Sequence, residues 1–253
     1  MSVAGDQYKA ERGGGIGEML KVIIQAGIIA LIVRTFLFQP FNIPSGSMKD
    51  TLLVGDYLFV SKFAYGYSRY SLPFSPNLFS GRIWSAPPER GDVTVFRLPR
   101  DTSVDYIKRV IGLPGDKVQM IDGVLYLNGN PVPKERIDDF VTTDALGGEM
   151  RVARYRETLP NGVSYTVLDS DPHGYLDNTP VFEVPPDHYF MMGDNRDNST
   201  DSRVPGAVGY VPFENLIGRA GLIFFSVKDD APIWQFWRWP WTVRFERLLK
   251  VVN

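Results

Sequence analysis

An apolar run near the amino terminus limits the fold of this chain more than any other feature. Between residues 19 and 38, 15 of 20 residues are apolar. Twenty residues in a helix rise roughly 30 Å, about the thickness of the hydrocarbon core of a bilayer. The uncharged part, residues 22–33, covers only 12 positions, so the span requires Lys21 and Arg34 to extend their charged ends toward the two interfaces. The sequence therefore predicts a transmembrane helix over residues 19–38.

Two other structures would produce a similar run. A buried core helix should show a polar face, whereas residues 22–33 offer only Gln25. A cleaved signal peptide should end in a small-x-small site, but this run meets Arg34 and then large residues. We therefore prefer a retained anchor.

Charges around the anchor indicate its orientation. Lys9, Arg12 and Lys21 precede the apolar core, and only one basic residue closely follows it. Because cytoplasmic flanks carry the excess of Lys and Arg, we expect residues 1–18 to form a cytoplasmic tail. Residues 39–253 are then an extracytoplasmic domain.

Beyond Pro40 the pattern changes to short apolar runs that are rich in β-branched and aromatic residues. Such runs predict strands, and Asp122-Gly123 and Asn128-Gly129 are hairpin turn signals. No long amphipathic helix is visible after residue 50, so the predicted fold class is mainly β. The runs are Tyr57–Val60, Val93–Phe96, Tyr106–Ile111, Val118–Ile121, Val124–Leu127, Phe182–Val184 and Leu222–Val227.

Two stretches interrupt this pattern. Residues 66–90 carry many Tyr, Ser, Pro and Phe, which predicts a surface excursion. Residues 130–185 are polar and irregular. We therefore expect an inserted subdomain of strands and loops at about residues 119–185.

Composition excludes several functional classes. The formal net charge is -2, so no broad basic field marks a nucleic-acid binder. Cysteine is absent, which excludes disulfides, thiol catalysis and thiolate metal sites. With only two histidines, a histidine-based metal cluster is not expected. We expect neither a cofactor nor a metal.

Ser47 is the first candidate for chemistry. A Ser-Gly-Ser turn alone is a weak signal, because Gly and Ser populate ordinary turns. Ser47 lies 14 residues after Val33, however, so a fully extended connection reaches only about 50 Å from the membrane. A reactive serine held there could act on a segment that leaves the bilayer.

A serine nucleophile needs a base that accepts its proton, and Lys108 lies in an apolar, strand-like run. Alternation along a strand places it on the face opposite Arg109. If Lys108 points inward, desolvation lowers its pKa and a neutral amine becomes available as a base. If it points outward, it is an ordinary solvated lysine. Lys49, which is close in sequence to the serine, and Lys62 are rival bases.

The two histidines have little support as bases. His173 lies in a turn-like stretch, and His188 stands just before an apolar run. No G-x-S-x-G elbow surrounds any serine, so a histidine triad is disfavoured.

A dense polar loop covers residues 191–203. Its three aspartates suggest calcium, but Arg196 falls where the second ligand of an EF-hand belongs. Asp197 and Asp201 are able to pair with Arg196 and Arg203. We interpret the loop as a self-satisfied scaffold that supports a site built elsewhere.

Four of the five tryptophans lie within residues 234–241, with Arg238 among them. Amphipathic rings beside arginine suit a membrane–water interface. An ordinary packed tail accounts for them about equally well.

Together these segments resemble the bacterial type I signal peptidases, the Ser–Lys enzymes that remove signal peptides from exported proteins. The motifs follow an amino-terminal anchor in the family's order and span residues 41–219. They are Pro44–Met48 with Thr51-Leu52 and Gly55-Asp56, Arg90–Phe96, Tyr106–Arg109 with Gly112–Asp116, and Gly193–Ser199 with Asp201–Arg203.

The resemblance implies a coiled antiparallel β-sheet catalytic domain behind one transmembrane helix. It implies that Ser47 is the nucleophile and Lys108 the general base. The Ser45 hydroxyl would join the Ser47 N–H in an oxyanion hole, and Ser199 would hydrogen-bond the lysine. The residues that it implies as structural support are Asp194, Asp197, Asp201 and Arg203.

One position departs from the resemblance. The family usually has proline two residues after the methionine, where this chain has Asp50. The change loosens the local backbone and adds a charge near the nucleophile, so the oxyanion geometry is the feature that it affects most.

The implied function is removal of signal peptides from secretory preproteins by acyl transfer, at the bacterial cytoplasmic (inner) membrane. We expect a monomer that contacts lipid and binds no nucleic acid. Substrates would carry small residues one and three positions before the cut. The alternatives are a specialised pilus-processing peptidase, a self-cleaving repressor, which the anchor argues against, and a non-catalytic, membrane-tethered β domain.

Overall fold

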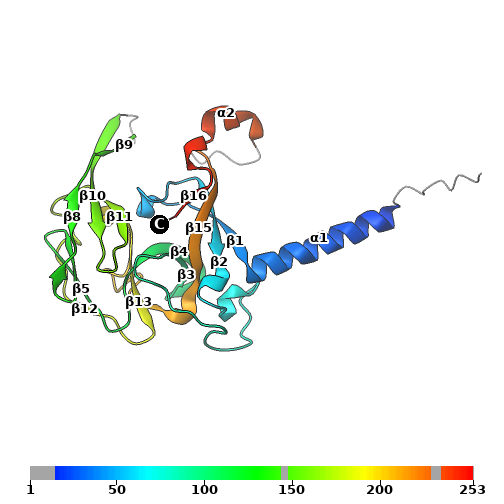
Figure 1. The fold of residues 1–253 in the computed structure, drawn as a ribbon, viewed down its shortest axis with the longest axis horizontal. Coiled ribbons are helices and arrows are strands. Elements are labelled where there is room, and N and C mark those ends of the chain that lie inside the picture. Colours follow the sequence, from blue (N-terminus) through cyan, green and yellow to red (C-terminus); the bar gives the residue numbers. More distant parts are fainter. Residues whose placement is uncertain (1–14, 144–147, 229–234, 253) are drawn as a thin grey trace, which may run out of the picture.

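The computed structural model describes residues 15–143, 148–228 and 235–252. Its first element, α1 (Ile16–Phe36), projects from the body as a single rod (Figure 1). Within the described ranges it is the one helix long and apolar enough to cross a membrane, and its apolar window is not buried against the body. The helix begins three residues before the predicted start. Most of the predicted tail lies outside the described residues.

The helix also ends before residue 38, because the chain enters the sheet there. Phe38 opens strand β1 (Phe38–Asn42) and pairs with Ser61. The Tyr67 hydroxyl donates to the Phe36 carbonyl at 2.7 Å, which fastens the end of the helix to the body. The last apolar residues of the predicted span therefore belong to a strand.

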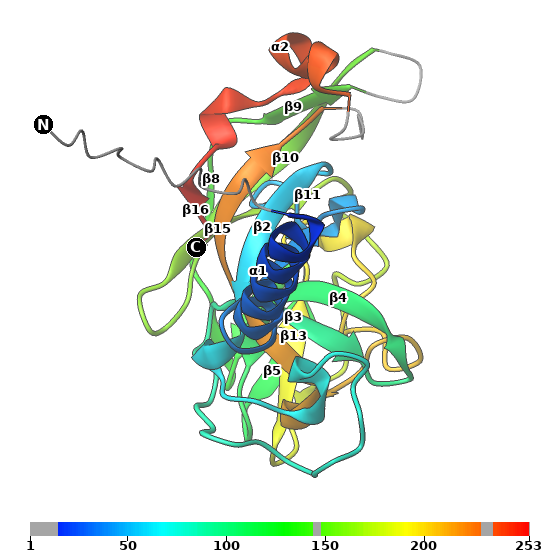
Figure 2. The same cartoon turned by 90° about the vertical axis from the view of Figure 1, so that its right-hand side faces the viewer.

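The body is built around an eight-stranded antiparallel sheet, in the order β1-β2-β15-β3-β4-β13-β14 with β16 beside β15. Several of its strands are long and curved (Figure 2). The prediction of a mainly β, antiparallel domain is confirmed. The remaining bounds are β2 (Asp56–Ser61), β15 (Leu216–Ser226), β3 (Val93–Leu98), β4 (Asp101–Gly112), β13 (His188–Met192), β14 (Val211–Pro212) and β16 (Lys250–Val251).

The insertion contains more regular structure than its composition indicated. It forms two small antiparallel sheets, one of β11-β10-β8 with β9 on β10 and one of β12-β5-β6-β7. Charged side chains on β8 and β10 obscure the period-two pattern from which strands are recognised. The bounds are β5 (Lys117–Ile121), β6 (Val124–Leu127), β7 (Asn130–Pro131), β8 (Lys134–Arg136), β9 (Phe140–Thr143), β10 (Glu149–Thr158), β11 (Ser164–Asp169) and β12 (Phe182–Glu183).

The two predicted hairpin turns are present. Asp122 and Gly123 have φ of 46° and 71°, and Asn128 and Gly129 have φ of 53° and 81°. Two successive residues with positive φ form the type I′ turn that matches the twist of paired strands. These turns connect β5 to β6 and β6 to β7.

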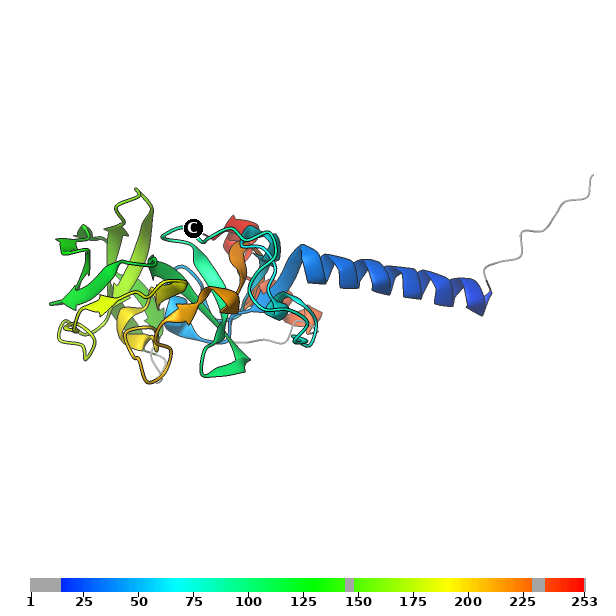
Figure 3. The ribbon, with the colours of Figure 1, turned by 90° about the horizontal axis from the view of Figure 1, so that it is seen from below.

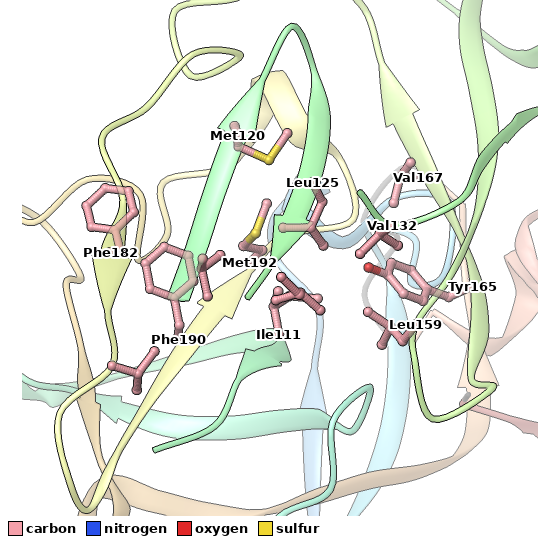
Figure 4. Packing of buried hydrophobic residues seen from close by; sticks show 13 residues of the cluster. Ile111, Met120, Leu125, Val132, Leu159, Tyr165, Val167, Phe182, Phe190 and Met192 are labelled. Carbon is pink, nitrogen blue, oxygen red and sulfur yellow. The ribbon is translucent and has the colours of Figure 1, made fainter. Parts of the chain in front are cut away.

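A hydrophobic cluster joins the insertion to the main sheet. Figure 4 shows Ile111 from β4 and Met192 from β13 packed close to Leu125 and Val132 of the insertion. All four side chains are at most 3% exposed. The insertion is therefore packed against the central strands and held in a fixed place beside them.

Candidate active site

Ser47 lies in a 3-10 turn, Gly46–Met48, between β1 and β2. The residues around it are held by apolar packing, since Met48 and Leu52 are 0% exposed and belong to the core cluster beneath β2 and β15. Ser47 itself is 8% exposed. The turn therefore presents its hydroxyl from a rigid base.

Lys108 on β4 reaches this hydroxyl. Its Nζ lies 2.6 Å from Ser47 Oγ and also donates to the Ile107 carbonyl at 3.1 Å. The residue is 3% exposed, and burial lowers the pKa of Lys108 to about 8, although Asp201 and Asp194 partly oppose the shift. The sequence leaves the direction of this lysine open, and in the structure it points inward and contacts the serine.

Arg109 points to the other face of β4, which is buried as well. Its guanidinium donates to both carboxylate oxygens of Asp194, at 2.9 and 2.7 Å, and to the Gly91 carbonyl at 2.7 Å. It also lies 4.1 Å from the centre of the Tyr165 ring. Alternation thus separates the two cations, but both faces of the strand are buried at this point.

The polar loop of residues 191–203 contacts the nucleophile turn directly. The Asn195 N–H donates to the Ser47 carbonyl at 3.1 Å, and the Asn195 side chain donates to the Gly46 carbonyl at 3.0 Å. Asp194 accepts a hydrogen bond from Thr51 at 2.5 Å. Hydrogen bonds from Asn195 and to Asp194 therefore hold the loop against this turn at two places. Asn195 was not among the predicted site residues, although it stands inside the motif that was recognised.

The other predicted supports brace this loop. Asp201 pairs with Arg203 at 2.8 Å and accepts the Gly193 N–H at 3.0 Å. Burial would raise the pKa of Asp201, but the Arg203 charge outweighs it and holds that pKa below its usual value. Asp197 accepts the Ser170 N–H at 2.7 Å and so ties the loop to the insertion.

A buried ion pair that the sequence did not indicate fastens the same loop to β10. Arg196 donates to both carboxylate oxygens of Glu157, at 2.6 and 2.5 Å, and Tyr165 donates to the same carboxylate at 2.7 Å. Glu157 is 0% exposed. One glutamate among the many charges of the insertion gave no signal, because only the folded chain distinguishes it from a solvated neighbour.

Ser45 and Ser199 lie beside Ser47 and Lys108, and they contact them differently. Ser45 Oγ is 3.5 Å from Ser47 Oγ. The buried Ser199 hydroxyl makes no hydrogen bond to Lys108 in this structure. It lies close enough to the Asp201 carboxylate to contribute to the lowered pKa of Asp201. A Cβ on Gly193 would stand 2.1 Å from Ser199 Oγ and 2.6 Å from the Ser47 carbonyl oxygen. Glycine is therefore required for this close approach.

The rival bases point elsewhere. Lys62 is 3% exposed and donates to the Ser71 carbonyl at 2.6 Å. Burial lowers the pKa of Lys62 to about 8 as well, with Arg34 and Arg97 adding to the effect. Its hydrogen bond nevertheless goes to the Ser71 loop and not to Ser47.

Within the described residues, none of the remaining candidates makes a hydrogen bond to Ser47 Oγ. The alkyl part of Lys49 folds back over Gly46, since a Cβ added there would lie 3.2 Å from Lys49 Cε. His188 Nδ1 bonds the Pro186 carbonyl at 2.8 Å. His173 is exposed and lies in a surface turn, where its backbone N–H donates to Asp171.

A hollow of about 380 Å³ opens beside Ser47 and Lys108, along the free part of β4. Strand β13 pairs with β4 only at Arg109, Val110 and Gly112. Residues 104–107 therefore have no neighbour on that side within the described sheet. Such an unpaired edge is able to receive an extended peptide as an additional strand.

Comparison with known proteins identifies the family of this chain. The family model described as "Signal peptidase, peptidase S26" matches residues 16–225. The chain is 47% identical over 208 residues to signal peptidase I of Rickettsia prowazekii (strain Madrid E), and likewise to that of Rickettsia typhi (strain ATCC VR-144 / Wilmington). Each alignment covers 79% of this chain and 76% of the relative.

Among solved structures, a signal peptidase I from Enterococcus faecalis V583 is 25% identical, with a TM-score of 0.30, and covers 53% of this chain and 97% of that one. The family match and the Rickettsia relatives settle the classification. This chain belongs to the signal peptidase family, peptidase S26, the peptidases that remove signal peptides.

Proposed function

We propose that this chain is a membrane-anchored serine endopeptidase that removes signal peptides from secretory preproteins with a Ser47–Lys108 dyad. One observation carries the proposal: a buried lysine whose pKa is lowered to about 8 lies 2.6 Å from a serine hydroxyl. At neutral pH a tenth or so of such an amine is uncharged. That fraction is able to accept the serine proton.

The reaction proceeds by acyl transfer. Lys108 Nζ takes the proton from Ser47 Oγ while Oγ forms a bond to the scissile carbonyl carbon. When the tetrahedral intermediate collapses, the C–N bond breaks and the lysine gives its proton to the leaving amine. A water molecule then loses a proton to Lys108 and attacks the ester, and the released Ser47 oxygen takes that proton back.

The developing oxyanion needs donors close to Ser47. The Ser47 N–H stands in the first turn of a 3-10 segment, where backbone N–H groups have no partner within the turn. Ser45 Oγ, 3.5 Å from Ser47 Oγ, supplies a second donor. One such donor is typically worth about 3 kcal/mol of barrier. The Asn195 bond to the Ser47 carbonyl fixes the direction of this turn.

The substrate segment before the cut extends along the free edge of β4 at residues 104–107. Backbone hydrogen bonds to a strand edge hold an extended peptide regardless of its sequence, and shallow pockets select its side chains. The preference for small residues one and three positions before the cut comes from the family. The hollow beside β4 is where this chain would exert it.

The membrane places the site next to its substrate. We assign α1 as a single-pass anchor in the bacterial cytoplasmic membrane, with the amino terminus in the cytoplasm and the domain outside. In Figures 1 and 3 the short helix α2 (Trp239–Thr242) lies level with the end of α1 that joins the body. Trp241 and Trp237 near it are 77% and 55% exposed. Exposed indole rings at this level suit the headgroup region of the same membrane.

Cleavage of a preprotein by the purified full chain in detergent tests the proposal. Ser47→Ala and Lys108→Met should each reduce cleavage at least 1,000-fold, an order of magnitude typical of a lost nucleophile or base. Lys62→Met is the matched control, because Lys62 is equally buried and has the same lowered pKa but bonds elsewhere. Cleavage retained by Lys108→Met, or lost equally in Lys62→Met, would contradict the dyad.

A further inference from the structure

A second hollow opens on Ser47 from the side of the insertion. Its volume is about 390 Å³, close to that of the hollow beside β4. The two share only Ser45, Ser47 and Asn198 among their lining residues. They therefore meet at the nucleophile.

The walls of the second hollow come from one face of that arm. Phe140 and Thr142 of β9 pair with Val152 and Met150 of β10, so all four side chains stand on the same face. Leu168 of β11 closes the floor and is 2% exposed. The surface is mainly apolar, and the hollow is lined by side chains from this face of the sheet.

Polar groups border the hollow near the nucleophile. Lys49, Asn195 and Asn198 belong to its lining. The Lys49 side chain has no ion-pair partner among the described residues, and it folds over Gly46 at the rim. The hollow thus combines an apolar wall with one cation, which suits a peptide carrying apolar and acidic side chains.

The arm is attached to the turn that carries Ser47 through Asp50, three residues further along the chain. Asp50 accepts from Arg154 of β10 at 3.0 Å and from Thr166 of β11 at 3.2 Å. This pair is partly exposed, so by itself it contributes little to stability. Its geometric effect is to hold β10 and β11 beside Ser47.

The order of the reaction assigns the two hollows. The acyl half of the substrate stays bound through two chemical steps, so it needs the backbone hydrogen bonds that the β4 edge provides. The amine half leaves after the first step, and an apolar wall without strand pairing releases it more readily. We propose that the second hollow binds the first residues after the cut, the start of the mature protein, and that the β9–β10 arm selects them. This inference rests on the proposed peptidase function.

Two matched series of peptides test the assignment with the full chain in detergent. One series varies the first two residues after the cut among Ala, Leu, Asp and Lys, and the other varies the residues one and three positions before it. Met150→Lys introduces a charge on the lining face. Val141→Lys is the control, because Val141 is on the same arm, 52% exposed, and outside the lining.

Met150→Lys should lower kcat/KM about tenfold for peptides with Leu after the cut, and favour Asp there, while the preference before the cut stays unchanged. Lys49→Glu should reverse the order of Asp and Lys after the cut. Val141→Lys should match the wild type in both series. Melting temperatures of all variants establish that each is folded.

The outcomes separate this inference from the function on which it rests. A wild type that cleaves no preprotein, or a Ser47→Ala variant that still cleaves, overturns the peptidase and the inference with it. Cleavage that responds equally to Met150→Lys and Val141→Lys overturns the inference alone. So does a Met150→Lys variant that changes the preference before the cut.

Discussion

Arg109 donates two hydrogen bonds to Asp194, and both side chains are almost completely withdrawn from solvent. Arg109 follows the proposed base in the chain, and Asp194 precedes the asparagine that bonds the Ser47 carbonyl. One ion pair therefore fixes the strand of the base to the loop that holds the nucleophile.

Removing one partner should damage stability and activity together. Arg109→Met leaves the Asp194 carboxylate buried without its counter-charge, which we expect to cost roughly 3–5 kcal/mol of unfolding free energy. Urea unfolding measures the loss. Glu183→Gln is the control, because its pair with Lys117 is 71% and 60% exposed and should contribute less than about 1 kcal/mol. Equal losses in both variants would contradict the assignment.

The activity should rise with pH. Because only the neutral amine accepts the serine proton, and burial lowers the pKa of Lys108 to about 8, kcat/KM should increase nearly tenfold per pH unit below that value and level off above it. Lys62 titrates in the same range, so the profile is measured again in Lys62→Met. If the pH dependence of kcat/KM disappears in Lys62→Met, the titrating group is Lys62 and not Lys108.

Lys108 should also lower the free energy of unfolding at neutral pH. Its folded pKa is lower than its unfolded value of 10.5, so the unfolded chain binds more protons between about pH 8 and 10.5, and stability rises with pH across that window. At neutral pH the buried charge is unfavourable. Lys108→Met should therefore abolish cleavage and yet raise the melting temperature at pH 7, with a smaller gain at pH 10. A melting temperature that falls at both pH values would contradict this account.

Gly193 should tolerate no side chain. A Cβ at this position would stand 2.6 Å from the Ser47 carbonyl oxygen, so Gly193→Ala must push the polar loop away from the nucleophile. We expect at least a 100-fold loss of kcat/KM, since small displacements of catalytic groups have effects of this size. Gly206→Ala, where a Cβ meets no atom within 4 Å, should retain activity. A fully active Gly193→Ala would show that the loop need not lie so close.

The sequence pointed to Ser47 and Lys108 because both stand in short motifs whose residue order is specific. The structure brings the two side chains within 2.6 Å of each other, and their roles as nucleophile and base stay a proposal. The packing partners were harder to find. Glu157 and Arg154 are charged residues in a polar strand, and nothing local distinguishes a buried ion pair from a solvated one.

The strands, too, fall into those that the sequence predicts and those that it does not. The bounds of strands with apolar alternation were predicted to within a few residues, because the alternation of apolar and polar residues in each segment follows its burial pattern. Strands β8 and β10 were missed, since their pairing satisfies backbone groups while many of their side chains face solvent. Likewise Phe38 counted as part of the apolar span, although its partner in the sheet, Ser61, lies 23 residues away. In each of these strands the structure depends on pairing with a segment that is distant in the sequence. The composition of the strand itself does not reveal that partner.

The tryptophan segment should contact lipid. The chain has no cysteine, so a single Cys at position 241 or 175 gives a clean site for an environment-sensitive dye. Trp241 and Tyr175 are 77% and 93% exposed, which means that protein burial affects neither label strongly. On reconstitution into phospholipid vesicles, the dye at position 241 should shift to the blue, because it enters the headgroup region, while the dye at position 175 on the insertion should stay unchanged. Two unchanged spectra would assign the segment to the aqueous surface, and two equal shifts would mean that the domain lies differently on the membrane.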